Sequence, residues 1–236
     1  MLNKKILAII PARSGSKGIK NKNLKKIQGN TTLFDICIKE ALKSKMLTKI
    51  VVSSDDKIIL KNARLYKKVN FIKRPKIYSR DNSSMYSVVL HTIDSLKKKK
   101  EKYDYIIILQ VTCPFRTFND IDNSINELIR KKEADTLVSV TIMEDFHPAR
   151  MYKKEGFYLK SLDKNQMRVN RQKLDKIYHR NGLIYLFKID NLIRFNSFYG
   201  EKIIPFLIEQ NRSLNIDNYN DLIYARAITK NKIIIT

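Results

Sequence analysis

Glycine, serine and cationic residues are concentrated in a loop that follows an apolar segment near the start of the chain. The apolar run Ile6–Ile10 leads into PARSGSKGIKNKNL at residues 11–24. Gly15 and Gly18 allow tight turns, so that consecutive backbone N–H groups can point at one ligand. The cations of the same loop are Arg13, Lys17, Lys20 and Lys22. N–H groups and cations together favour a polyanion, and we expect a nucleoside triphosphate.

The spacing of the two glycines excludes the best-known phosphate loops. Residues 15–18 read GSKG, with two residues between the glycines. The dinucleotide fingerprint needs G-x-G-x-x-G, and the Walker A loop needs four residues between its glycines before Lys-Ser/Thr. The other reading of the loop, a basic surface turn after a strand, stays open on these residues alone.

Apolar runs that are continuous rather than alternating recur along the chain. They are Ile6–Ile10, Ile50–Ser53, Tyr105–Leu109, Thr136–Val140 and Leu183–Phe187. Such runs are typical of strands buried on both faces. Helical patterns lie between them at 33–44, 56–67, 84–98 and 120–131, with Thr32, Asp55, Ser83 and Asn119 as expected N-caps. The alternation predicts an α/β fold with a mostly parallel sheet flanked by helices.

The unusual residues of the chain follow these predicted strands. The glycine loop follows the first strand, SSDD (53–56) the second, and LQVTCPFR (109–116) begins at the end of the third. Ligands of parallel sheets bind beyond the carboxyl ends of the strands. The three segments therefore predict one cleft.

Residues 143–180 interrupt the alternation. The stretch is polar, rich in Lys and Arg, and has an expected turn at 154–156. We interpret it as an arm that leaves the sheet and serves dimerisation, inserted in a single domain that spans residues 1–236.

Composition bounds the class of protein. The chain has 236 residues, 43% of them hydrophobic, and a net charge of +24. A basic face attracts nucleic acids, but the cations are spread along the sequence, and a positive field equally steers a small anionic substrate. We therefore expect no nucleic-acid partner.

Cysteine content and the N-terminus bear on location. Cys37 and Cys113 are the only cysteines and lie far apart, which predicts neither a disulfide framework nor a metal pair. The first apolar run is too short for a signal peptide or a membrane span. We expect a cytoplasmic protein without a membrane partner.

Nine short blocks, taken in order, resemble the acylneuraminate cytidylyltransferases, the CMP-sialic acid synthetases of bacteria and animals. They are IPARSGSKG, KNKNL, VVSSDD, RPKIYSRD, LQVTCPFR, HPAR, NRQ, HRNGLIY and NIDNYNDL. The resemblance implies a Rossmann-like nucleotidyltransferase that moves CMP from CTP to the anomeric 2-hydroxyl of a nine-carbon 2-keto sugar acid and releases pyrophosphate. N-acetylneuraminic, legionaminic and pseudaminic acids are such acceptors. It also implies Mg²⁺ or Mn²⁺ as cofactor, a homodimer, and surface polysaccharide biosynthesis.

The resemblance implies which residues bind the nucleotide. Family positions matching Arg13, Lys22 and Asn23 contact phosphates and ribose, and the segment from Arg74 to Ser83 is similar to the family's cytosine-binding segment. Met85 departs from the family's usual serine. The expected nucleotide-binding residues are Ala12, Arg13, Ser14, Gly15, Lys17, Lys22, Asn23, Arg74, Asp81 and Ser83, and the expected catalytic residues are Arg13, Lys22 and Asp217.

The resemblance also implies an acceptor site. Gln110 is similar to the glutamine that relatives aim at the sugar, and cations of the arm reach the sugar carboxylate from the other subunit. HRNG at residues 179–182 departs from the family order, in which the arginine comes first, so His179 or Arg180 could serve. The expected substrate-binding residues are Gln110, Arg150, Arg171, Gln172 and Asn181.

A metal site is implied at Asn215-Ile216-Asp217, where relatives have Asp-x-Asp. Asn215 can coordinate through a neutral oxygen, and Mg²⁺ needs only one or two protein carboxylates besides substrate phosphates. Asp217 could equally be the N-cap of a helix at 219–229.

Three alternatives stay open. A Kdo cytidylyltransferase has the same fold, but its acidic ligand after the glutamine is absent from Val111–Pro114. A basic nucleic-acid-binding domain and a nucleotide-binding protein weakened in catalysis by Asn215 are the others. A catalytic thiol at Cys113 is disfavoured because it lacks an identifiable base.

Overall fold

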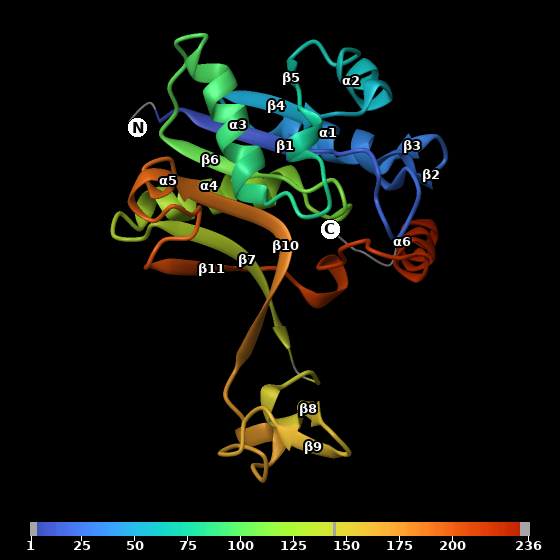
Figure 1. Cartoon of the computed structure of the whole chain (residues 1–236), viewed down its shortest axis with the longest axis vertical. Coiled ribbons are helices and arrows are strands. Elements are labelled where there is room, and N and C mark those ends of the chain that lie inside the picture. Colours follow the sequence, from blue (N-terminus) through green and yellow to red (C-terminus); the bar gives the residue numbers. More distant parts are fainter. Residues whose placement is uncertain (1–3, 144, 232–236) are drawn as a thin grey trace.

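A seven-stranded sheet forms the centre of the molecule, and the computed structural model describes residues 4–143 and 145–231. Its strands are β1 (Ile6–Pro11), β4 (Lys49–Ser54), β5 (Val69–Lys73), β6 (Tyr105–Ile108), β7 (Thr136–Met143), β10 (Ile177–Lys188) and β11 (Ile203–Leu207). Their order is β11-β7-β10-β6-β1-β4-β5 (Figure 1). β10 is antiparallel to β6 and β7, and the other pairs are parallel. The predicted mostly parallel sheet is confirmed.

Each predicted strand overlaps an observed one, but β5 and β11 were missed. The side chains of β11 alternate between exposed and half-buried, and most of those in β5 are exposed. Both strands are at edges of the sheet, and Pro205 in β11 is tolerated there because an edge strand leaves one row of N–H groups unpaired. A search for continuous apolar runs finds buried central strands and overlooks such edges.

Helices cover both faces of the sheet. α1 (Leu33–Lys43), α2 (Lys57–Ala63), α4 (Phe118–Arg130) and α6 (Tyr219–Asn231) pack on one face; α3 (Met85–Lys97) and the short α5 (Asn191–Arg194) pack on the other. Each face of the sheet has its own hydrophobic core, and successive side chains of β1 pack into the two cores in turn. Ala8 and Ile10 lie in the core on the α1 side, and Leu7 and Ile9 lie in the core on the α3 side. This double burial explains the continuous apolar sequence of the central strands.

The predicted N-cap at Thr32 is confirmed, and three others were wrong. Asp56 rather than Asp55, Ser84 rather than Ser83, and Thr117 rather than Asn119 accept the first N–H groups of their helices. The shift at α2 has a consequence for the site: Asp56 caps the helix, and the carboxylate of Asp55 is left to bind the loop after β1.

A small subdomain projects from the sheet on extensions of β7 and β10 (Figure 1). We call residues 145–176 the arm. It contains the antiparallel hairpin of β8 (Tyr152–Glu155) and β9 (Tyr158–Ser161), with Gly156 at a φ of +63° in the turn between them. The short helices η3 (Pro148–Arg150) and η4 (Arg171–Lys173) complete it.

The remaining elements are local. They are η1 (Lys22–Leu24), β2 (Lys26–Gln28), β3 (Thr31–Thr32), η2 (Lys76–Tyr78) and η5 (Gln210–Arg212). Among the residues that the structure describes, no helix combines the length and apolar character that a membrane crossing requires.

Candidate active site

A cleft of about 400 Å³ lies at the carboxyl ends of β1 and β6. Its walls come from the glycine-containing loop at residues 12–23, called here the phosphate loop, and from residues 74–88, 110–112 and 215–217. The predicted site residues at its surface are Arg13, Lys17, Lys22, Asn23, Arg74, Asp81, Ser83, Gln110, Asn215 and Asp217. Segments far apart in the sequence thus meet where the strand ends predicted one cleft.

The phosphate loop is packed against the segment that precedes α6. A Cβ atom on Gly18 would lie 2.1 Å from the carbonyl oxygen of Asp217, so only glycine fits there without a shift of the backbone. Lys22 Nζ donates to Ile216 O at 2.7 Å and to Asp217 Oδ1 at 2.9 Å. The loop and residues 215–217 therefore form one unit.

Two further contacts fix the shape of the loop. Gly15 has a φ of +67°, which L-residues rarely adopt. Asn23 Nδ2 donates to Arg13 O at 3.0 Å across the base of the loop. Ala12 is fully buried and its N–H donates to Ser53 O at the end of β4. Ala12 and Gly15 thus shape the loop rather than line the cleft.

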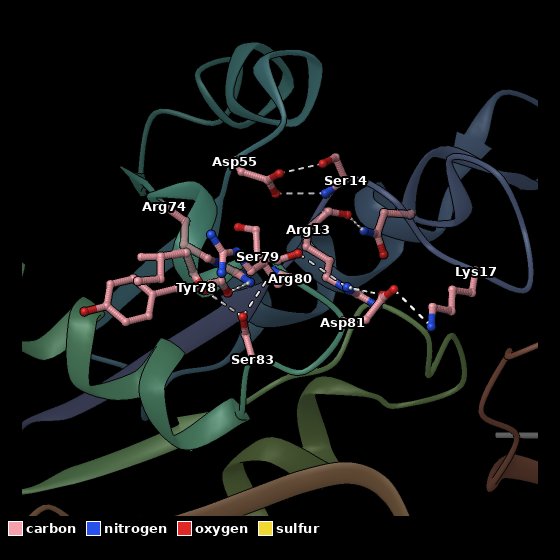
Figure 2. A network of polar contacts seen from close by, with 12 residues as sticks. Arg13, Ser14, Lys17, Asp55, Arg74, Tyr78, Ser79, Arg80, Asp81 and Ser83 are labelled. Carbon is pink, nitrogen blue, oxygen red and sulfur yellow. Dashed lines mark hydrogen bonds and ion pairs between the residues drawn. The ribbon is translucent and has the colours of Figure 1, made fainter.

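Cations of the phosphate loop reach across to Asp81 on the opposite wall. Asp81 accepts from Arg13 at 2.8 Å and from Lys17 at 3.1 Å (Figure 2). Hydrogen bonds from these two side chains lower the pKa of Asp81. Lys20, predicted to join these cations, is exposed and does not line the cleft.

Asp55 holds the loop from the other side. Its carboxylate accepts from the backbone N–H of Ser14 at 2.9 Å and from the Ser14 hydroxyl (Figure 2). Burial of Asp55 opposes ionisation, but the hydrogen bonds from Ser14 outweigh it and lower the pKa. Asp55 was predicted to cap the following helix and not to hold this loop; its position at the end of a strand was the available signal for a site role.

Arg74 is buried at the base of the cleft. Its guanidinium donates to Ser53 O at 2.5 Å and to Ser53 Oγ at 3.2 Å. It also donates to Tyr78 O at 3.5 Å (Figure 2). Burial lowers its pKa to about 10, and Arg13 contributes in the same direction while Asp55 opposes. Arg74 stays charged at neutral pH and ties the wall of residues 74–83 to β4.

The same wall contains residues to which the sequence analysis assigned no role. Tyr78 and Arg80 line the cleft beside Ser83. Ser83 Oγ accepts from Arg80 N at 3.1 Å and donates to Ile77 O at 2.9 Å, which closes the loop (Figure 2). Tyr78 and Arg80 lie inside the block RPKIYSRD, so membership of that block could have indicated that they line the site.

Gln110 borders the cleft next to the irregular turn within β10. Gly182 in this turn has a φ of +82°, and a Cβ there would lie 3.2 Å from Gln110 Oε1. The buried guanidinium of Arg116 donates to Gln110 O at 3.1 Å and to Leu183 O at 2.9 Å. Arg116 therefore fixes Gln110 relative to β10.

Of the HRNG residues, Arg180 and not Asn181 is accessible. Asn181 is 4% exposed and bonds to Ser139 at 2.6 Å in the neighbouring strand. Arg180 is exposed, donates to the hydroxyl of Tyr199, and its guanidinium lies 4.9 Å from the centroid of that ring. His179 is exposed as well. None of Arg180, Asn181 and Tyr199 lines the cleft, and Tyr199 is a partner of Arg180 that no motif indicated.

Asn215 and Asp217 lie together at the cleft. Asn215 Nδ2 donates to Asp217 Oδ2 at 3.0 Å. The cap of α6 is Asn218, which exchanges hydrogen bonds with Asp221 at 2.9 and 3.1 Å. The alternative role of Asp217 as helix cap is therefore wrong, and two thirds of its side chain surface is exposed toward solvent.

The predicted arm residues do not line this cleft. Arg171 and Gln172 border a separate cavity of about 430 Å³ within the arm, where Arg171 pairs with Asp145 at 2.9 Å. Arg150 is exposed at the end of η3. Within one chain these three side chains are thus separate from Gln110.

Both cysteines are buried and free. Burial raises the pKa of Cys113 to about 12 and also raises that of Cys37. Neither thiol is in the reactive, ionised form.

In the described residues 4–143 and 145–231, no three His, Cys, Asp or Glu side chains gather as a metal cluster. Two carboxylates line the cleft: Asp81, which pairs with Arg13 and Lys17, and Asp217, which lies beside the amide of Asn215.

Comparisons with known proteins agree with this geometry. The N-acylneuraminate cytidylyltransferase of Escherichia coli O18:K1:H7 is 29% identical over 97% of this chain, which spans about half (53%) of that protein. The CMP-N,N'-diacetyllegionaminic acid synthase of Legionella pneumophila is 31% identical over 90% of this chain and 91% of its own length. A solved structure of CMP:2-keto-3-deoxy-manno-octonic acid synthetase with CTP superposes with a TM-score of 0.71 at 17% identity, covering 97% of this chain and 99% of that one; it shows a shared fold.

The match to a family covers almost the whole sequence. Residues 7–235 match the family described as cytidylyltransferase, and this range includes the phosphate loop, the wall of residues 74–83 and the Asn215–Asp217 segment. The chain therefore belongs to the cytidylyltransferase family and is a nucleotidyltransferase.

Proposed function

We propose that the protein transfers CMP from CTP to the anomeric 2-hydroxyl of a nine-carbon sialic-type acid and releases pyrophosphate. The observation that carries the proposal is the cleft in which Arg13 and Lys17 pair with Asp81 and Lys22 pairs with Asp217, with Gln110 at the adjoining wall. The names of the E. coli and Legionella relatives support acceptors of the sialic and legionaminic type.

The reaction displaces pyrophosphate in one step at the α-phosphorus of CTP. The oxygen of the acceptor hydroxyl forms a bond to that phosphorus and loses its proton to solvent, the bond to the β-phosphate breaks, and charge grows on the departing oxygens. Fixed cations that face this charge lower the barrier. We assign this work to Arg13, Lys17, Lys22 and the N–H groups of the phosphate loop.

We assign the binding of the cytosine base of CTP to the wall of residues 74–83. Arg74 is fixed by three hydrogen bonds, so the backbone groups beside it are held in place before the ligand arrives. A rigid polar edge rejects bases that leave its groups unpaired. Asp81 and Ser83 complete the nucleotide-binding set in this proposal.

A magnesium ion, or manganese, fits the residues present. Asp217 supplies an exposed carboxylate beside the amide of Asn215 at the cleft, and Mg²⁺ takes few protein ligands when phosphates and waters supply the rest. When bound, the ion would neutralise phosphate charge. Asp217 and Asn215 are the residues that would hold it.

The acceptor acid is assigned to the region of Gln110. Arg180, stacked on Tyr199, is an accessible cation on β10, two residues before the Gly182 that adjoins Gln110. Arginine binds carboxylates through two parallel hydrogen bonds. Asn181 would support the acceptor site indirectly, by holding β10 in place, because its amide is hydrogen-bonded within the sheet.

The arm is assigned to a homodimer that completes this site. Its hairpin exposes Phe157 completely, Tyr158 at 81% and Leu159 at 68%, and contiguous exposed apolar side chains mark interaction surfaces. Arg150, Arg171 and Gln172 would then reach the acceptor of the partner subunit. We extend the proposal to a cytoplasmic enzyme of surface polysaccharide biosynthesis without a nucleic-acid or membrane partner; two free cysteines fit a reducing compartment.

The direct test is release of pyrophosphate from CTP with Mg²⁺, with N-acetylneuraminic, legionaminic, pseudaminic and Kdo acids offered separately. We expect release with at least one of the nine-carbon acids and no release with UTP. Release with Kdo alone would replace the proposal by the Kdo-type alternative. CTP binding without turnover on any acid would favour a nucleotide-binding protein.

Lys22→Ala is expected to lower kcat/KM for CTP by about 100-fold, because it removes a cation from the developing charge. The matched control is Lys20→Ala, in the same loop but exposed and away from the cleft; it should leave kcat/KM within about twofold. Equal losses in the two variants would mean that overall charge, and not the position of Lys22, matters.

Asn215→Asp is expected to lower the Mg²⁺ concentration for half-maximal activity about 30-fold, the effect of one added negative charge on a divalent ion at ~4 Å in water. Asn211→Asp in η5, which is exposed and does not line the cleft, adds the same charge as control. If both metal titrations match the wild type, the ion is held elsewhere.

The double substitution Phe157→Asp and Leu159→Asp is expected to convert the dimer to monomer, as measured by light scattering, because it places two charges in an apolar contact. The KM for the acid should rise while the Kd for CTP stays unchanged. Leu65→Asp, at a side chain that is 77% exposed at the end of α2, is the control and should stay dimeric. A monomeric wild-type protein would contradict the assignment of the arm.

A further inference from the structure

A second, larger cavity lies at the end of the sheet opposite the cleft. It measures about 920 Å³ and is enclosed by the C-terminal half of α3, residues 100–103, and α5 with the two residues before it. Asp104 N–H donates to Lys5 O, just before β1, and Ile189 N–H donates to Asp104 O. The cavity therefore adjoins the amino ends of β1 and β6, where no residue of the proposed reaction lies.

The lining of this cavity is apolar. Seven of the twelve lining residues are apolar or aromatic: Leu90, Ile93, Leu96, Tyr103, Ile189, Leu192 and Ile193. Ile193 is 84% exposed at the mouth, whereas Leu96 and Ile93 are buried at the base. The volume lies within the range of about 300–1,000 Å³ typical of small-ligand sites, which are apolar with a few polar groups at one end.

The rim of the cavity is cationic. Lys97, Lys100 and Lys102 border it, and among the described residues none of their ammonium groups has an ion-pair partner. Of the two acids there, Glu101 is paired with Lys49 at 2.6 Å, and Asp190 is the single exposed carboxylate. The rim thus has an excess of positive charge over an apolar interior.

We propose that this cavity binds a single-chain anionic amphiphile, a long-chain carboxylate, with its chain among the α3 and α5 side chains and its head group at the rim lysines. The occupant follows from charge and shape. An apolar interior under unpaired cations matches an apolar chain with an anionic end. All the apolar lining side chains except Ile193 are buried or half-buried, whereas a membrane-inserting surface would expose several of them.

The test uses a tryptophan reporter, since the chain has no tryptophan. Ile193→Trp places the reporter at the mouth; Ile223→Trp, at a side chain that is 62% exposed on α6, is the control. Titration with dodecanoate below its micelle concentration should give a saturable blue shift with Ile193→Trp and none with Ile223→Trp. Across octanoate, decanoate and dodecanoate the affinity should rise about fourfold per methylene.

A double variant tests whether the rim lysines bind the carboxylate head group. Lys97→Ala with Lys100→Ala should weaken dodecanoate binding about three- to tenfold at low salt, and less at high salt, while dodecanol binding stays unchanged. Both positions lie outside the catalytic cleft, so pyrophosphate release should persist.

Four results would overturn the proposal. They are a response of equal size in the Ile223→Trp control, affinity independent of chain length, binding of phosphatidylglycerol vesicles but not of the monomeric acid, and a blue shift of Ile193→Trp that depends on protein concentration alone. The last would mean that a second copy of the chain covers the cavity.

Discussion

The contact between Gly18 and the carbonyl of Asp217 is the constraint on which the site depends. It joins a loop at the start of the chain to a segment near its end, and Lys22 strengthens it through Ile216 O and Asp217. Because the Cβ of any larger residue would lie 2.1 Å from that oxygen, the loop approaches the segment only with glycine at this position. The cations of the loop and the oxygen donors of residues 215–217 therefore face one cleft as one rigid unit.

A second constraint comes from the antiparallel direction of β10. The strand returns from the arm and inserts between β6 and β7, so its turn at Gly182 meets the end of β6 at Gln110. Arg116 fixes this meeting point because its guanidinium donates to Gln110 O and to Leu183 O, and among the described residues its buried charge has no carboxylate partner. Such burial is costly, and a guanidinium that spans two carbonyls offsets part of that cost. The same strand supports both the arm and the proposed acceptor wall, which links the two.

Whether a feature of the fold or the site could be predicted from the sequence depends on how far apart in the chain its interacting residues lie. The central strands and the phosphate loop could be predicted because each is a short segment with a distinctive local composition. The position of the loop after a strand also predicted that Arg13 and Lys22 would lie at the cleft. The edge strands β5 and β11 lack a continuous apolar pattern. Asp55 was assigned to a helix cap and Tyr199 to no role, because their contacts are with Ser14 and Arg180, which only the folded chain brings near. The family resemblance named Asn181, yet its burial against Ser139 depends on register between β7 and β10.

The amide at Asn215 is consistent with the charge balance of the cleft before ligand arrives. Lys22 neutralises Asp217, and Arg13 and Lys17 share Asp81. A carboxylate at position 215 would stand about 3 Å from Asp217 Oδ2, where the amide now donates a hydrogen bond, and two carboxylates this close repel unless a cation joins them. The amide thus stabilises the Asn215–Asp217 pair through a hydrogen bond, and it offers one less negative charge to the metal ion proposed for this site. The protein tolerates this loss of one negative charge because its net charge of +24 creates an electrostatic field that attracts anionic nucleotides together with their counter-ions.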